Sequence, residues 1–367
     1  MMAKPYTYIA LSFAVLLNIN TSFADVPVIT GSPTIDKPQL LEWPLDIPSE
    51  DPDLSEPTAN NINDLHARIS KCDDINVVLS TAGNYHMALR DLWYEHYLPN
   101  NKEIIGNWFY TTSPPISPEQ ITNNALTFGN VRIDCRPIIA VGPIKLMTKL
   151  QELNYLDGGP IPVIKNQGNV ILVKKGNPKK IKTIWDLGRK DVKVITSNPD
   201  TENGSFSNYR DSVYNIALND TNTPSNWTAD SLFNAIFNSE ERYNKHPGIH
   251  ENKSHHRTRV KWLAGKRIHH REVPWSIAYG QADAGLIFYH LAKYMVETFP
   301  DKFDIVPLGG TVDAPVPVTG NKQATLFIAR IKGELNNEQY QAREELIKAY
   351  RSNEFDGILF KHGLLRP

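Results

Sequence analysis

Two stretches decide the fold of this chain: Asn76-Val-Val-Leu-Ser-Thr-Ala82 and Trp275-Ser-Ile-Ala-Tyr-Gly-Gln-Ala-Asp-Ala-Gly-Leu-Ile-Phe-Tyr289. The first is a short apolar run that stops at two hydroxyl-bearing residues and a small one, which is typical of a buried strand that ends in a loop. The second passes from polar residues into an apolar run through Ala-Asp-Ala-Gly. Together they indicate an α/β architecture whose polar groups gather at strand ends.

The N-terminus indicates export. Residues 8–17 form a short apolar run, and Ser22-Phe-Ala24 offers a small-x-small cleavage site before Asp25. Because the run is too short to cross a bilayer, we interpret residues 1–24 as a secretory signal peptide. No cysteine lies at the cleavage point, and no later segment reaches spanning length. We therefore expect a soluble protein of the periplasm.

Composition narrows the class of protein. The mature length suits two domains. A net charge of −1 argues against a dedicated nucleic-acid binder. The two cysteines, Cys72 and Cys135, each precede an apolar run. In an oxidising compartment they would form one disulfide or remain two buried thiols, and the sequence leaves both possibilities open.

After a Pro-rich extension over residues 25–71, the chain alternates between strand and helix patterns. Ser117-Pro-Glu-Gln120 predicts a helix start, with Ser as N-cap, Pro at the first position and a capping Gln. A polar stretch at residues 174–180 is a candidate hinge, and residues 219–271 are polar and irregular. Strands are predicted at residues 75–79, 104–110, 138–141, 170–173, 192–196, 303–307 and 324–329, and helices at 83–97, 144–153, 209–218, 231–237, 291–299 and 337–351.

Several segments carry a family resemblance. They are Val77-Val-Leu-Ser-Thr-Ala82, Gly142-Pro-Ile-Lys-Leu-Met147, Gln167-Gly-Asn-Val-Ile-Leu-Val-Lys-Lys-Gly-Asn-Pro178 with Ile184-Trp-Asp-Leu187, Gly280-Gln-Ala-Asp-Ala-Gly-Leu-Ile-Phe-Tyr289 and Phe360-Lys-His-Gly-Leu364. In these segments residues 75–367 resemble the periplasmic substrate-binding proteins of ABC importers, and they are most similar to the molybdate/tungstate-binding branch.

The resemblance implies a type II periplasmic-binding-protein fold, with two lobes, a hinge and an interlobe cleft. Each lobe would be a mixed sheet flanked by helices. Lobe one would comprise residues 72–173 plus 318–367, and lobe two residues 174–317. It further implies a monomer that captures a small anion such as molybdate without a cofactor and delivers it to a membrane ABC permease.

In that family, hydroxyls and backbone N–H groups at helix N-termini hold the anion. Carried over to this chain, the ligand-binding residues would be Ser80, Thr81, Thr112, Ser113, Gly142, Ser205 and Tyr289, with Arg271 as a possible cationic contact. Serine and threonine are also common turn and cap residues, so a purely structural role stays open.

Two departures bear on the ligand. The position of the family's tyrosine is occupied by Phe288, so Tyr289 falls one residue later. The lobe-two loop carries Asp200 and Glu202, which would repel an anion if they pointed inward and would then favour a cationic or polar organic ligand.

A segment rich in histidine and basic residues raises a second possibility. Residues 246–270 contain six histidines, and Glu251 is the only acid between residues 242 and 271. Imidazoles could bind a metal ion, but neighbouring cations oppose it and no cysteine or carboxylate spacing completes a site. The alternatives for this segment are a solvated basic face, or His269 and His270 turned toward an anion.

For the protein as a whole, a sensory module without transport is a further alternative.

Enzyme motifs are absent. The chain contains no P-loop, no Gly-x-Gly-x-x-Gly, no His-Glu-x-x-His and no Gly-x-Ser-x-Gly elbow. We therefore expect a binding protein rather than an enzyme.

Overall fold

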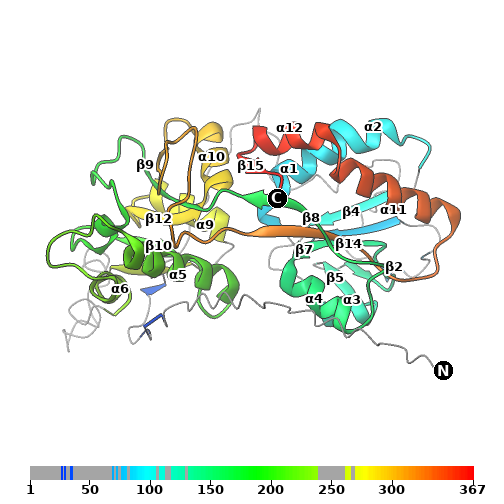
Figure 1. The fold of residues 1–367 in the computed structure, drawn as a ribbon, viewed down its shortest axis with the longest axis horizontal. Coiled ribbons are helices and arrows are strands. Elements are labelled where there is room, and N and C mark those ends of the chain that lie inside the picture. The colour runs from blue at the N-terminus through cyan, green and yellow to red at the C-terminus, as the bar shows by residue number, and fades with distance from the viewer. Residues whose placement is uncertain are drawn as a thin grey trace, which may run out of the picture.

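The structure is a computed structural model, and it describes residues 26–27, 29, 34–35, 68–69, 72, 76–80, 83–104, 107–111, 117–128, 131–238, 261–265 and 269–367. The predicted signal peptide, Thr81, Thr112, Ser113 and most of the His-rich segment lie outside these residues. Figure 1 shows two lobes side by side, joined by strands that run between them.

The sheet of lobe one has six strands in the order β15-β8-β14-β7-β3-β4. The strands β7, β3 and β4 are parallel to one another, whereas β14, β8 and β15 pair antiparallel. A small three-stranded sheet, β2-β6-β5, belongs to the same lobe. The strands are β2 (Arg68–Ile69), β3 (Asn76–Ser80), β4 (Asn107–Thr111), β5 (Leu126–Phe128), β6 (Val131–Ile133), β7 (Ile139–Pro143), β8 (Ile161–Asn166), β14 (Thr325–Arg330) and β15 (Leu364–Leu365).

Helices cover both faces of this sheet. One apolar core lies between the sheet and the helices α1, η3, α11 and α12, and another lies under α3 and α4 (Figure 1). The predicted cap of α3 is confirmed, because the Ser117 side chain and backbone exchange hydrogen bonds with Gln120. The elements are η2 (Gly83–Tyr85), α1 (His86–Asp91), η3 (Leu92–Tyr97), α2 (Leu98–Asn100), α3 (Pro118–Thr122), α4 (Ile144–Glu152), α11 (Asn337–Tyr350) and α12 (Asn353–Lys361).

The sheet of lobe two also has six strands, in the order β1-β11-β10-β12-β9-β13. One core packs η4, α5 and α6 on its first face, and another packs α9 and α10 on its second face. The elements are β1 (Thr34–Ile35), β9 (Asn169–Lys174), η4 (Ile184–Gly188), β10 (Val194–Thr196), α5 (Asn203–Asn219), α6 (Ala229–Phe237), β11 (Trp262–Ala264), α9 (His269–Ala278), β12 (Ala284–Phe288), α10 (Tyr289–Thr298) and β13 (Phe303–Val306).

Asparagine side chains join the two interlobe crossings. Asn166 Oδ1 accepts hydrogen bonds from the N–H groups of Gly168 and Ala324 at 3.2 and 2.9 Å. Asn169 and Asn321 bind each other reciprocally, at 2.8 and 2.9 Å. Gly168 has φ +76°, and a Cβ there would lie 3.0 Å from neighbouring side-chain atoms, so the first crossing requires glycine. These contacts make the pair of crossings one connected hinge.

Two features of the organisation differ from the sequence prediction. Strand β9, expected in lobe one, pairs with β12 and β13 of lobe two, so the first crossing lies at residues 167–168 rather than at 174–180. Strand pairing is set by distant partners, which the local pattern does not encode. Part of the Pro-rich extension, β1, pairs in parallel with β11 at the edge of the lobe-two sheet.

Cys72 and Cys135 form a disulfide, with their Cα atoms 5.2 Å apart. Of the two possibilities that the sequence left open, the structure therefore contains the bridge. No helix within the described residues is long and apolar enough to cross a membrane.

Candidate functional site

Both sheets contain strands with a parallel neighbour on either side. In lobe one this holds for β3, between β7 and β4, and in lobe two for β11, between β1 and β10, and for β10, between β11 and β12. The strand order reverses beside β10, because the chain passes from β11 on one side of it to β12 on the other. At such a point the connections leave toward opposite sides of the strand, which opens a crevice at its carboxyl end. By this rule the expected positions for a ligand are the ends of β3 and β10, after Ser80 and Thr196. These two strand ends are called the lobe-one crevice and the lobe-two crevice below.

At the lobe-one crevice, strand register places the backbone of two predicted ligand residues, Ser80 and Gly142, on neighbouring strands. Ser80 pairs with Thr111 of β4 on one side and with Val141 of β7 on the other, and Gly142 follows Val141. Thr81, Thr112 and Ser113 come directly after these strand ends but lie outside the described residues. The register thus brings the ends of β3, β4 and β7 to the same edge of the sheet.

The lobe-two crevice begins with Ser197, a residue that the sequence analysis did not select. Its side chain is fully buried, and its hydroxyl has no hydrogen-bond partner among the described residues. A buried hydroxyl without a partner is costly, so it marks a position where a ligand group could bind. Its place directly after a predicted strand was the available sequence signal.

Asn198 fixes the loop that follows. Its Oδ1 accepts hydrogen bonds from the backbone N–H groups of Asp200 and Thr201, at 2.8 and 3.1 Å, and its Nδ2 donates to the Gly265 carbonyl at 3.0 Å. The loop after β10 is thereby tied to the end of β11. As a result, the N-termini of α5 and α9 both start from this corner of lobe two.

Glu202 lies between these two helices. It is the N-cap residue of α5, and its Oε2 accepts a hydrogen bond from the backbone N–H of His269, at the start of α9, at 3.0 Å. Burial, together with the nearby charge of Glu272, raises the pKa of Glu202 to about 7 despite this hydrogen bond. Asp200, by contrast, is exposed. Of the two acids that the sequence flagged in this loop, only Glu202 is turned into the protein.

A row of stacked rings connects lobe two with lobe one. His269 stacks on Tyr209 with a centroid distance of 4.0 Å, and Tyr209 contacts Phe288 at 5.5 Å. Phe288 is followed by His290 at 5.7 Å, and His290 stacks on Tyr85 of lobe one at 4.6 Å. The lobes therefore meet through aromatic and imidazole rings close to both crevices.

Hydrogen bonds fix the roles of two of these imidazoles. His290 Nε2 lies 2.9 Å from the Asn84 carbonyl across the lobe boundary, and His269 Nε2 lies 2.9 Å from the Leu286 carbonyl. Since a carbonyl only accepts, each Nε2 carries a proton. Burial lowers the pKa of both histidines to about 3, so both are neutral at pH 7. Each Nδ1 is then an acceptor with no partner among the described residues.

His270 and His86 extend this contact, with ring centroids 6.1 Å apart. Burial lowers the pKa of His270 well below its usual value, and the charges of His86 and Arg271 add to the effect. A neutral imidazole cannot form an ion pair with an oxyanion. The suggestion that His269 or His270 is a cationic contact is therefore not supported by their burial.

The remaining predicted residues fall into two places. Ser205 and Arg271 are each the third residue of a helix, in α5 and α9 respectively, and both are half-buried near the lobe-two crevice. Tyr289 begins α10, and its N–H donates to the Gly168 carbonyl at 3.0 Å, while its ring packs against Gly363. Tyr289 therefore lies at the hinge.

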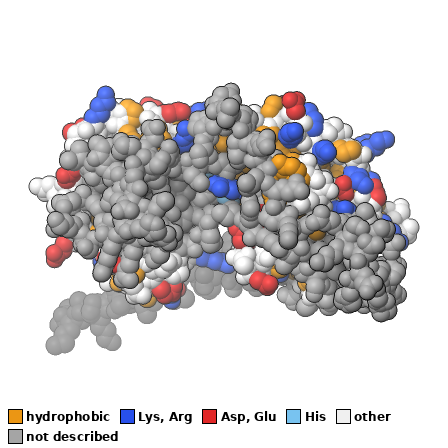
Figure 2. Space-filling model, turned by 180° about the vertical axis from the view of Figure 1, so that it is seen from behind, with side chains coloured by type: hydrophobic (Ala, Val, Ile, Leu, Met, Phe, Trp, Pro, Cys, Tyr) orange, Lys and Arg blue, Asp and Glu red, His pale blue; other side chains and the backbone are white. Residues whose placement is uncertain are grey.

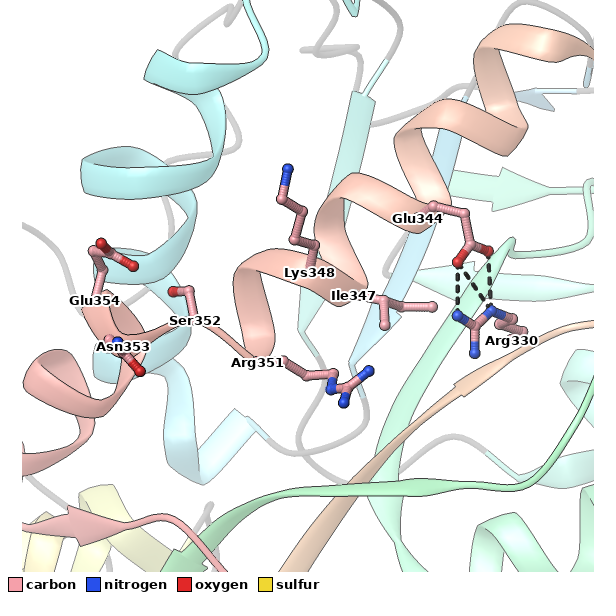
Figure 3. A pocket seen from close by; sticks show the side chains of 8 residues that line it. All are labelled: Arg330, Glu344, Ile347, Lys348, Arg351, Ser352, Asn353 and Glu354. Carbon is pink, nitrogen blue, oxygen red and sulfur yellow. Dashed lines mark hydrogen bonds and ion pairs between the residues drawn. The ribbon is translucent and has the colours of Figure 1, made fainter.

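Two other cavities lie away from the crevices. One, of about 520 Å³, is on lobe one between α11 and the start of α12 (Figure 3). Arg330 lines this cavity and donates hydrogen bonds to both carboxylate oxygens of Glu344. The charges of these two side chains therefore compensate each other. The second, of about 660 Å³, lies on lobe two beside η4 and the loop before β14.

Charged side chains of both signs are visible on the described part of the face in Figure 2. In the view from behind, cationic and anionic side chains are interspersed over the described surface (Figure 2). Among the described residues, no group of three or more His, Cys, Asp or Glu side chains is arranged to hold a metal ion. Of the His-rich segment, only His269 and His270 are among the described histidines.

Residues 138–364 match the family model of bacterial extracellular solute-binding proteins, which is more than half of the chain. The chain belongs to this family. It has the two-lobed type II periplasmic-binding-protein fold, with two sheets flanked by helices. The motif resemblance is therefore confirmed at the level of the family and the fold.

Solved structures give distant likenesses. Peb3 from Campylobacter jejuni is 14% identical over 80% of this chain and 100% of its own, with a TM-score of 0.44. The molybdate-binding protein of Azotobacter vinelandii is 12% identical over 79% and 99%, with a TM-score of 0.49. The sulfate-binding protein SubI of Mycobacterium tuberculosis is 14% identical over 79% and 85%, also with a TM-score of 0.49. No curated protein sequence matches the chain.

Proposed function

We propose that this solute-binding protein captures a small ligand between the carboxyl ends of β3 and β10 and delivers it to a membrane ABC permease. The observation that carries the proposal is the matched pair of crevices, one in each sheet, with lobe contacts beside both. A ligand held from both sides favours the closed arrangement, because it gains contacts there that the open form lacks. Closure would take place about the crossings at residues 166–169 and 321–325.

The ligand of this proposal is a small oxyanion, as in molybdate-type receptors. Lobe one would supply hydroxyls and N–H groups from residues 80–81, 112–113 and 142. Lobe two would supply the first turn of α5 around Ser205, the hydroxyl of Ser197 and the guanidinium of Arg271. Neutral donors and helix N-termini are well suited to an anion, because they neutralise its charge without a counter-ion.

A second candidate keeps the site and changes the cargo to a polar organic solute with hydrogen-bond donors. Glu202 favours it, since its carboxyl group is turned inward. The acceptor nitrogens of His269 and His290 could also serve such a ligand. A neutral acceptor cannot bind a fully ionised oxygen, but it can bind an ammonium or hydroxyl group.

The two candidates are separated by ligand-induced stabilisation. The unfolding temperature of the full mature chain would be measured with molybdate, tungstate, sulfate, phosphate, zinc and a set of amino and hydroxy acids. A ligand at about 100 times its Kd stabilises the folded state by about 2.7 kcal/mol. A response to oxyanions supports the first candidate. A response limited to the amino and hydroxy acids supports the second, and a response to zinc alone rejects both.

A further inference from the structure

Glu202 is an acid of lobe two that reaches a helix N-terminus beside the end of β10. Its carboxyl group receives the first N–H of α9, the position at which an anionic ligand would otherwise gain the most from that helix. Ser197, buried and without a hydroxyl partner in the described structure, lies on the same loop. The carboxyl group and the proposed ligand therefore share one corner of the site.

Titratable groups near Glu202 lie on two described helices. On α9 these are the neutral His269, whose backbone N–H donates to Glu202, and the second acid, Glu272, with Arg271 between them in sequence. On α5, burial and the charge of Glu202 raise the pKa of the Tyr209 hydroxyl. Tyr85, across the lobe boundary, contributes to the same shift. Lys266 and Arg267 precede α9 outside the described residues.

No Lys, Arg or His side chain within the described residues forms an ion pair with Glu202. Within that part of the chain, this half-buried carboxyl group therefore has no paired counter-charge. An anion that enters the same corner becomes a second negative charge beside it. The anion and the Glu202 carboxylate would repel each other strongly in a partly buried site. One of the two groups therefore takes up a proton.

We propose that Glu202 couples ligand capture to proton uptake: the site binds an oxyanion together with one proton, which is held on the Glu202 carboxyl group. The proposal rests on the oxyanion cargo proposed above. Capture then weakens as the pH rises, and Glu202 acts as a specificity-determining residue rather than as a structural cap. Burial and Glu272, which raise the pKa of Glu202 to about 7, place the transition in a range that the periplasm can reach.

Proton counting on the wild-type protein tests this directly. Binding of molybdate and of sulfate would be followed by calorimetry in two buffers of different ionisation enthalpy. Neither anion changes protonation between about pH 6 and about pH 8, so any proton taken up belongs to the protein. We expect close to one proton per anion at about pH 8 and much less at about pH 6, with affinity falling up to about tenfold per pH unit above pH 7.

Two variants assign the proton to its residue. Glu202→Gln keeps an oxygen that accepts the His269 N–H, and it should bind the anion with no proton uptake and little dependence on pH. Asp200→Asn removes the same charge from an exposed acid two residues away and should behave as the wild type does. Anion binding without proton uptake in the wild type, or unchanged uptake in Glu202→Gln, would overturn the proton coupling but leave the oxyanion cargo standing. Failure of both anions to bind at either pH would reject the oxyanion cargo as well.

Discussion

Replacing His290 with phenylalanine should reverse the order of stability between neutral and acid pH. His290 is fully buried between Tyr85 and Phe288, and its Nε2–H donates to the Asn84 carbonyl. Phenylalanine keeps the stacking but leaves that carbonyl without its donor. At about pH 7.5 the variant should therefore be less stable, by about 1–2 kcal/mol.

The acid side follows from the sign of the pKa shift. The folded pKa of His290, about 3, lies below the unfolded value of about 6.5, so below pH 6.5 the unfolded chain binds a proton that the folded chain does not. The stabilising contribution is complete above about pH 6.5 and is lost as the pH falls toward about 3. At about pH 4.5 the wild type has lost about 2.7 kcal/mol through this residue, at 1.36 kcal/mol per unit over two units.

The variant has no imidazole at position 290 and so does not undergo this proton-linked loss of stability. At about pH 4.5 it should therefore exceed the wild type in stability by roughly 1 kcal/mol. Urea denaturation at several pH values measures the crossing. His96→Phe, at a histidine on η3, is the matched control and should give no crossing. Stability curves of His290→Phe and wild type that stay parallel from neutral to acid pH would refute the reasoning. The pKa of Glu202 is raised in the folded state, so its protonation stabilises the folded protein as the pH falls. This makes the loss of stability toward acid pH less steep in both proteins and leaves the difference between them unchanged.

Three further predictions concern the hinge, the disulfide and the crevice. Gly168→Ala should cost about 2 kcal/mol because φ is positive there, whereas Gly159→Ala, in open space, should cost under about 0.5 kcal/mol by the same denaturation assay. Replacing Cys72 and Cys135 by serine should lower stability by about 4 kcal/mol for the loop of sequence separation 63, and reductant should have the same effect on the wild type only. Ser197→Ala removes a buried hydroxyl that lacks a partner in the described structure, so it should leave the unliganded protein as stable or more stable by about 1 kcal/mol while weakening ligand binding. A loss of stability without a loss of affinity would mean that this hydroxyl has only a structural role.

Short-range patterns predicted much of the secondary structure. The capping box at Ser117, the strand that ends at Ser80 and the helix over residues 337–350 all depend on neighbours a few residues away, so the sequence alone was sufficient for them. Helix α9 was missed, since its His269-His-Arg271 start looks like a solvated basic segment and Pro274 interrupts the pattern. This helix is buried in spite of its composition, because it packs on β9, β10 and β12 of the lobe-two sheet.

What the sequence determined by itself is the family motif, the alternation of strands and helices, and the strand ends at which polar residues collect. Only the tertiary structure decided that β9 pairs in lobe two, that Glu202 rather than Asp200 turns inward, and that His290 reaches Asn84 across the lobe boundary. The physical reason is the distance along the sequence over which each interaction acts. Propensities and caps act between residues close along the chain, whereas strand partners, burial and the pKa values that follow from burial depend on groups far apart in sequence.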